Sequence, residues 1–181
     1  MKLKIFIAAQ DKDKPHWYRK EILSATRSVF GDANAEVEID QDIGVNVWNA
    51  PPKMYGKYDA VWLPDLGVSK TDRDAGLYAL PGGSRTIDWC LLFNADPAYE
   101  IYSDSERRRV FEEVLKLVKP QTGHLFLGKF PYGIDRALQM VQEALPARYT
   151  AELYNVEYEI VGHGFHTLKH IHVKPLTQAG G

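Results

Sequence analysis

Short apolar runs alternate with longer segments of helical periodicity along most of the chain. A short apolar or alternating run that ends in a turn is typical of a strand, whereas apolar residues three or four positions apart indicate one face of a helix. On this basis strands are expected at residues 4–8, 35–40, 58–63, 124–130, 153–161 and 165–173, and helices at 15–30, 103–118 and 134–145. The short runs at 45–48 and 87–93 are candidates for a further strand.

Local signals mark the ends of several of these elements. Ser103 and Glu106 form a capping box, in which the serine accepts a hydrogen bond from the first turn and the glutamate reaches back. Pro120 ends that helix because proline has no N–H to donate. Gly162-His163-Gly164 separates the last two alternating strands and therefore predicts a hairpin. Residues 67–87 lack a regular pattern and are expected to form a long loop over the carboxyl edge of the sheet.

The order of these elements predicts an α/β fold. Strands that alternate with helices favour a mostly parallel sheet covered by helices on both faces, here a Rossmann-like sheet of seven strands. The last two strands close it with a C-terminal antiparallel hairpin. Ligands in such sheets bind beyond the carboxyl ends of the strands. A length of 181 residues suits one domain, assigned to residues 1–176, with a flexible tail at 177–181.

Composition narrows the classes of function. The formal net charge is -2, so the surface as a whole is not a basic field for nucleic acid. The single cysteine, Cys90, excludes an internal disulfide framework and a zinc site built on cysteines. No apolar run approaches the length of about 20 residues that a membrane span needs, and the short apolar N-terminus is not a signal peptide. A cytoplasmic protein in a reducing compartment, without a membrane partner, is expected.

The succession of strand, loop, helix, turn and strand between residues 58 and 129 resembles a known family. The strand at 58–63 leads into Pro64-Asp65-Leu66-Gly67, and the helix at 103–118 leads through Lys119-Pro120-Gln121-Thr122-Gly123 into a strand that ends in Gly128-Lys129. With the terminal hairpin, this pattern resembles the class I S-adenosylmethionine-dependent methyltransferases over the greater part of the chain. The resemblance implies a methyltransferase-type sheet with S-adenosylmethionine as the cofactor.

The family likeness also implies site residues. Gly128-Lys129-Phe130-Pro131-Tyr132-Gly133 is most similar to a segment of ribose 2′-O-methyltransferases whose lysine is catalytic. Lys129 and Asp65 would then be catalytic, because a lysine near carboxylates can help to deprotonate a sugar hydroxyl. Two members of the family's Lys-Asp-Lys-Glu set have no counterpart here, since Thr-Leu-Lys stands at 167–169, where the glutamate is expected. The implied cofactor-binding residues are Ala8 and Gln10 after the first strand, Asp40 at the ribose hydroxyls, and Asn49 in the loop of the third strand.

The turn after the first strand departs from the family pattern. The family binds its cofactor there with glycines that let backbone amides approach the ligand. Residues 8–15 read Ala-Ala-Gln-Asp-Lys-Asp-Lys-Pro and contain no glycine, so the motif is degenerate. One hypothesis is methyl transfer to a nucleic acid or a small molecule, and the other is a catalytically inactive module for binding a protein partner or for assembly. A nucleotide- or sugar-phosphate-binding protein unrelated to methylation is a third.

Four histidines lie close together near the C-terminus. They are His163, His166, His170 and His172, of which the last two project from the same face of the expected strand. Such a cluster fits either a transition-metal site or an exposed polar strand face that alternates with Ile171. Since the stretch has no carboxylate or cysteine to complete a ligand set, the exposed face is favoured and no metal is assigned.

Overall fold

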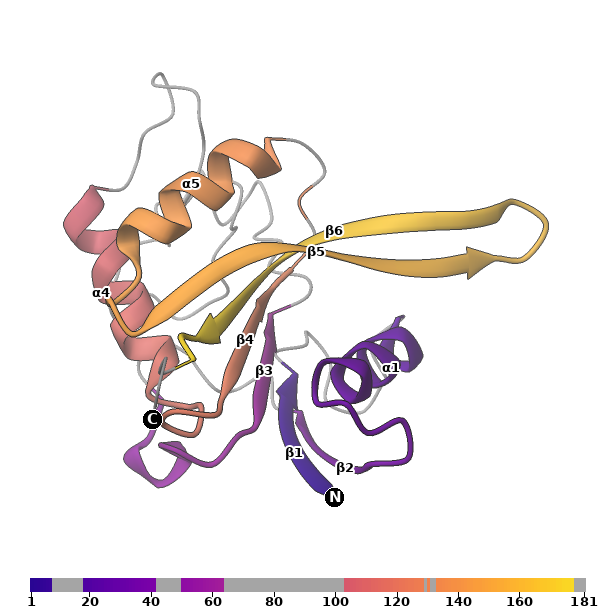
Figure 1. The fold of residues 1–181 in the computed structure, drawn as a ribbon, viewed down its shortest axis with the longest axis horizontal. Coiled ribbons are helices and arrows are strands. Elements are labelled where there is room, and N and C mark those ends of the chain that lie inside the picture. Colours follow the sequence, from indigo (N-terminus) through magenta and orange to yellow (C-terminus); the bar gives the residue numbers. More distant parts are fainter. Residues whose placement is uncertain (8–17, 42–49, 64–102, 129, 131–132, 178–181) are drawn as a thin grey trace, which may run out of the picture.

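The computed structural model describes residues 1–7, 18–41, 50–63, 103–128, 130 and 133–177. Six strands, three α-helices and one 3-10 turn occupy these residues (Figure 1). In chain order they are β1 (Lys2–Ile7), α1 (Arg19–Val29), β2 (Glu36–Gln41), η1 (Pro52–Met54), β3 (Ala60–Leu63), α4 (Asp104–Leu115), β4 (His124–Leu127), α5 (Ile134–Ala144), β5 (Tyr149–Ile160) and β6 (Gly164–Pro175).

The six described strands form one sheet in the order β2-β1-β3-β4-β6-β5. The first four strands in the chain are parallel, whereas β6 runs antiparallel to both of its neighbours, β4 and β5. The predicted α/β fold, with a mostly parallel sheet and a C-terminal antiparallel hairpin, is therefore confirmed. The candidate strands at 45–48 and 87–93 and the loop expected at 67–87 lie outside the described residues.

Alternation along the strands separates two apolar cores. Ile5 and Trp62 face α1 on one side of the sheet, and Phe6 and Val61 face the layer of α4 and α5 on the other. Successive side chains of a strand point to opposite faces, so a run that is apolar at every position is buried on both sides. All four residues of β3 are buried, as this pattern requires.

Several boundaries differ from those expected. The strand expected at 58–63 begins at Ala60, and Tyr58 forms an isolated bridge with Val118 instead. The strand expected at 153–161 begins at Tyr149, because Tyr149 and Ala151 already place buried side chains against α5 and the sheet. α4 ends at Leu115, three residues earlier than the expected helix end at 118 and five residues before Pro120. The hairpin turns at Gly162 and Gly164, both with positive φ.

Gly123, in the turn that leads into β4, has no room for a side chain. A Cβ at this position would lie 2.7 Å from the backbone N and O of Lys119 and would overlap Val118. Lys119 cannot move away easily, since its N–H donates to the Tyr58 carbonyl at 2.8 Å and its own carbonyl accepts from Gly123 N at 2.8 Å. We expect Gly123→Ala to lower the free energy of unfolding by about 2–3 kcal/mol in urea denaturation.

Gly162→Ala is the matched control for this substitution. A Cβ at Gly162 meets nothing within 4 Å, although its φ of +83° strains any L-residue. The expected loss is therefore about 1 kcal/mol. Equal losses for the two variants would contradict a steric role for Gly123.

Candidate functional site

Four parallel strands end together at one edge of the sheet. Ile7 of β1 is in register with Gln41 of β2 and with Trp62 of β3, and Leu63 of β3 is in register with Leu127 of β4. The ends of these strands form the carboxyl edge of the sheet, where α/β sheets bind ligands. This edge is the candidate functional site.

Most of the predicted site residues follow these strand ends in the sequence. Ala8, Gln10, Asn49, Asp65 and Lys129 lie outside the described residues. The strands that precede Ala8, Asp65 and Lys129 end at the candidate edge, at Ile7, Leu63 and Leu127. Among the predicted site residues, Asp40 is the one that the structure describes.

Asp40 lies next to the last residue of β2, in register with Phe6. Its Oδ2 accepts a hydrogen bond of 2.8 Å from the Tyr58 hydroxyl. Lys4 Nζ lies 3.7 Å from the same oxygen and 3.6 Å from Oε1 of Glu38. With 42% of its side chain exposed, the Asp40 carboxylate retains acceptor capacity beyond the tyrosine bond.

Tyr58 fixes the position of this carboxylate. Burial raises the pKa of the Tyr58 hydroxyl, and the hydrogen bond to Asp40 raises it further. The phenol therefore stays protonated and donates to Asp40 at any ordinary pH. Its ring packs against Phe6 with centroids 5.5 Å apart, so it cannot easily turn away.

A buried histidine–tyrosine pair lies near the candidate edge, on the α1 face. His170 follows Lys169, whose carbonyl accepts from Phe130 N, and precedes Ile171, which pairs with Leu127 at the end of β4. Its Nδ1 lies 3.0 Å from the Leu168 carbonyl, which can only accept. In the neutral ring Nε2 is thus the acceptor, and the Tyr18 hydroxyl donates to it at 3.2 Å. The pair joins the start of α1 to β6.

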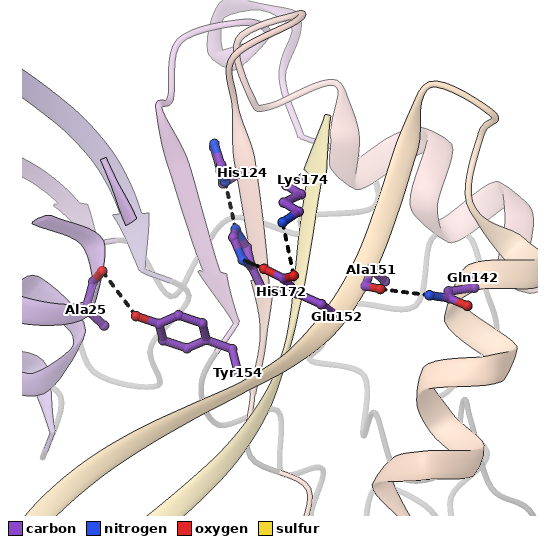
Figure 2. A network of polar contacts seen from close by, with 8 residues as sticks. All are labelled: Ala25, His124, Gln142, Ala151, Glu152, Tyr154, His172 and Lys174. Atoms are coloured by element: carbon purple, nitrogen blue, oxygen red, sulfur yellow. Dashed lines mark hydrogen bonds and ion pairs between the residues drawn. The ribbon is translucent and has the colours of Figure 1, made fainter. Parts of the chain in front are cut away.

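A second histidine network lies on the same face, toward the amino end of β4 (Figure 2). His172 Nδ1 lies 3.1 Å from Oε1 of Glu152, and Lys174 Nζ lies 3.0 Å from Oε2. His172 Nε2 lies 2.7 Å from Nδ1 of His124. A carboxylate only accepts, so His172 donates through Nδ1, and its neutral ring accepts through Nε2 from His124.

The surroundings keep both imidazoles of this network neutral. Burial, together with the neighbouring His172 and Lys174, lowers the pKa of His124 to about 4. Burial also lowers the pKa of His172, against the opposing effect of Glu152. Partial burial acts to raise the pKa of Glu152, but hydrogen bonds from Lys174 and His172 outweigh it and the pKa is lowered. The network joins β4, β5 and β6 and is separate from the candidate edge.

The exposed polar face predicted for the histidine cluster is wrong for two of its members. His170 is 0% and His172 3% exposed, because β6 lies inside the sheet between β4 and β5 and is covered there on both faces. His163 and His166 are exposed near the hairpin turn. Over the described ranges, no three His, Cys, Asp or Glu residues are grouped so as to bind a metal. His124 and Glu152, which complete the network, carried no signal in the sequence pattern.

The sequence matches no protein-family model and no curated protein. Similar solved structures include three of variants of the 16S rRNA (adenine(1408)-N(1))-methyltransferase from Catenulisporales acidiphilia, one of them with cosubstrate SAM. They are 9%, 9% and 8% identical to this chain, with TM-scores of 0.45, 0.45 and 0.47. The alignments cover 98%, 97% and 99% of this chain and 87%, 88% and 88% of the other. At these scores, the fold assignment rests on the strand order and strand directions of the chain itself.

Within the part of the chain that the structure describes, no helix is long and apolar enough to cross a lipid bilayer.

Proposed function

We propose that this chain binds S-adenosylmethionine at the carboxyl edge of its sheet and transfers the methyl group to a nucleic acid or a small molecule. The observation that supports this proposal is the convergence of four parallel strand ends in a sheet that closes with a reversed last strand, β6. A parallel sheet of this kind offers its ligand site at that edge.

The chemistry of Asp40 fits the cofactor. A partly exposed carboxylate near the end of β2, with one oxygen engaged by Tyr58, suits the two hydroxyls of a ribose. Ala8, Gln10 and Asn49 are proposed to contact the rest of the cofactor, whose sulfonium supplies an electrophilic methyl group. Asp65 and Lys129 are proposed to orient the acceptor and to take up the proton that it loses.

The alternative is a module that has the fold without the catalysis. The absence of glycine from residues 8–15 favours it, because glycines let backbone amides approach a ligand and this segment of the sequence has none. In that case the chain would serve protein binding or assembly, since a fold does not fix a function.

Calorimetric titration with S-adenosylmethionine and S-adenosylhomocysteine separates the two. If the proposal is right, both ligands bind, and Asp40→Asn weakens binding about tenfold or more through lost charge-assisted hydrogen bonds. Glu38→Gln is the matched control, because Glu38 lies on the same strand face and also contacts Lys4. It should change affinity less than about twofold.

Tyr58→Phe tests whether Asp40 acts directly. This variant leaves the carboxylate in place but removes its hydrogen bond, so a smaller loss than for Asp40→Asn is expected. Absence of heat with either ligand, in a folded wild-type protein, would favour the non-catalytic module. Binding without transfer of labelled methyl groups to RNA or small-molecule acceptors would place the chain among cofactor-binding regulators.

A further inference from the structure

The outer part of the β5–β6 hairpin projects beyond the rest of the sheet (Figure 1). β4 pairs with β6 only from Ile171 to Val173, whereas β5 and β6 stay paired as far as Ile160 and Gly164. The projecting residues 153–169 are termed the arm. A two-stranded ribbon is at best marginally stable in water unless something packs on it, so the surroundings of its two faces are informative.

One face of the arm is covered by the chain itself. Val156 and Leu168, directly opposite each other, are buried in the core beneath α1. Tyr154, on the same face, donates from its hydroxyl to the Ala25 carbonyl of α1 at 3.5 Å (Figure 2).

The opposite face is exposed and carries apolar side chains at both ends. Leu153 at its base is 45% exposed, and Phe165 and Val161 near its tip are 75% and 93% exposed. Exposed large apolar side chains are a feature of interaction sites. Between these ends lie three charged side chains, Glu157, Glu159 and Lys169, all exposed.

The pattern on this face is complementary to itself. Asn155 lies opposite Lys169, and Glu157 lies opposite Thr167, in adjacent rungs of the ladder. Consider a two-fold axis that passes between those two rungs, parallel to the face and perpendicular to the strands. It packs a second arm onto this face with its strands running in the opposite direction. Lys169 of each copy then lies near Glu157 of the other, and Phe165 lies near the exposed Leu153 of the other. Glu159, opposite Phe165 in the ladder, also falls beside that leucine.

We propose that the occupant of this face is a second copy of the chain, and that two arms pack antiparallel across a two-fold axis. The contact is isologous, which is the commonest way for a soluble protein to dimerise. A nucleic acid suits the face less well, since Glu157 and Glu159 outnumber Lys169 on it. The proposal is independent of cofactor binding.

Sedimentation velocity of the full chain, at concentrations from about 1 to about 100 µM, tests the proposal. The wild type should shift reversibly from monomer to dimer. Glu157→Lys and Lys169→Glu should each weaken the dimer about tenfold or more, because each places like charges together twice per dimer. The double charge swap should recover most of the lost affinity, which a merely destabilised arm would not do.

Matched controls are Glu112→Lys on α4 and Lys20→Glu on α1, which make the same charge changes at exposed positions outside the arm. Both should dimerise like the wild type, and circular dichroism should show all variants folded. A wild type that stays monomeric throughout this range overturns the proposal, as does a double swap no better than either single variant. Binding of a single-stranded RNA oligonucleotide that is lost in Phe165→Ser, without any dimer, would assign the arm to nucleic acid instead.

Discussion

Trp62→Ala is expected to lower the free energy of unfolding by about 4 kcal/mol, a large share of the stability of a domain of this size. Trp62 is 0% exposed in the middle of the sheet, and its ring stacks on Phe126 with centroids 4.0 Å apart. Its indole N–H donates to Oγ1 of Thr26 in α1 at 2.9 Å. Truncation therefore leaves a cavity between the sheet and α1 and removes a hydrogen bond between them. Urea denaturation followed by far-UV circular dichroism measures the loss.

Trp62→Phe separates the contribution of ring packing from the contribution of the indole hydrogen bond. The phenyl ring can still pack on Phe126, and Thr26 keeps its own bond to the Ile22 carbonyl, so a loss of about 1–2 kcal/mol is expected. Tyr55→Ala, at a site that is 38% exposed, should cost less than about 1 kcal/mol. A loss for Trp62→Ala no larger than that for Tyr55→Ala would contradict the central position of this ring.

The central strands were predictable because a strand that is buried on both faces has apolar residues at every position. Residues 60–63 and 125–127 are two such runs, and both belong to central strands. The hairpin was equally predictable, since Gly162 and Gly164 supply the positive φ that its tight turn requires. These local signals fixed the fold class.

The surroundings of His170 and His172 were not predictable from alternation alone. Polar residues that alternate with Ile171 and Val173 indicate a strand with one face in water. In the fold, β6 lies between β4 and β5 with the α1 layer over its polar positions, and the two histidines are buried and hydrogen-bonded. The position of a strand within a sheet is a long-range property, which no short window of sequence contains.

The candidate site was predictable only in part, for the same reason. Asp40 was expected at the end of a strand, and it lies next to the last residue of β2, while its role in a site stays a prediction. Its partner Tyr58 was expected inside a strand, but it precedes β3. The side chain of Tyr58 reaches across β1 to the carboxylate of Asp40. The contact depends on the parallel pairing of β1 with both β2 and β3, which brings residues 18 positions apart together.

Acidification from pH 6.5 to pH 4 is expected to lower the free energy of unfolding by about 2–3 kcal/mol through His124 alone. Burial lowers the pKa of His124 to about 4 in the folded chain, against about 6.5 when unfolded. In this interval the unfolded chain binds more protons, so stability falls as the pH falls. The interval runs from the unfolded pKa to the folded pKa, and at each end one of the two states is half protonated, so the expected loss stays below the full difference in pKa.

His124→Asn should remove this dependence while keeping the fold. The asparagine amide can donate from close to the position of Nδ1 toward Nε2 of His172, but it does not titrate. Urea denaturation at several pH values should give a flatter slope for His124→Asn than for the wild type between pH 6.5 and pH 4. His163→Asn, in the exposed hairpin turn, is the control and should keep the wild-type slope. Identical slopes in all three proteins would show that the buried pair does not govern acid stability, whereas a slope changed only by His124→Asn would assign the pH dependence to protonation of the buried His124 ring.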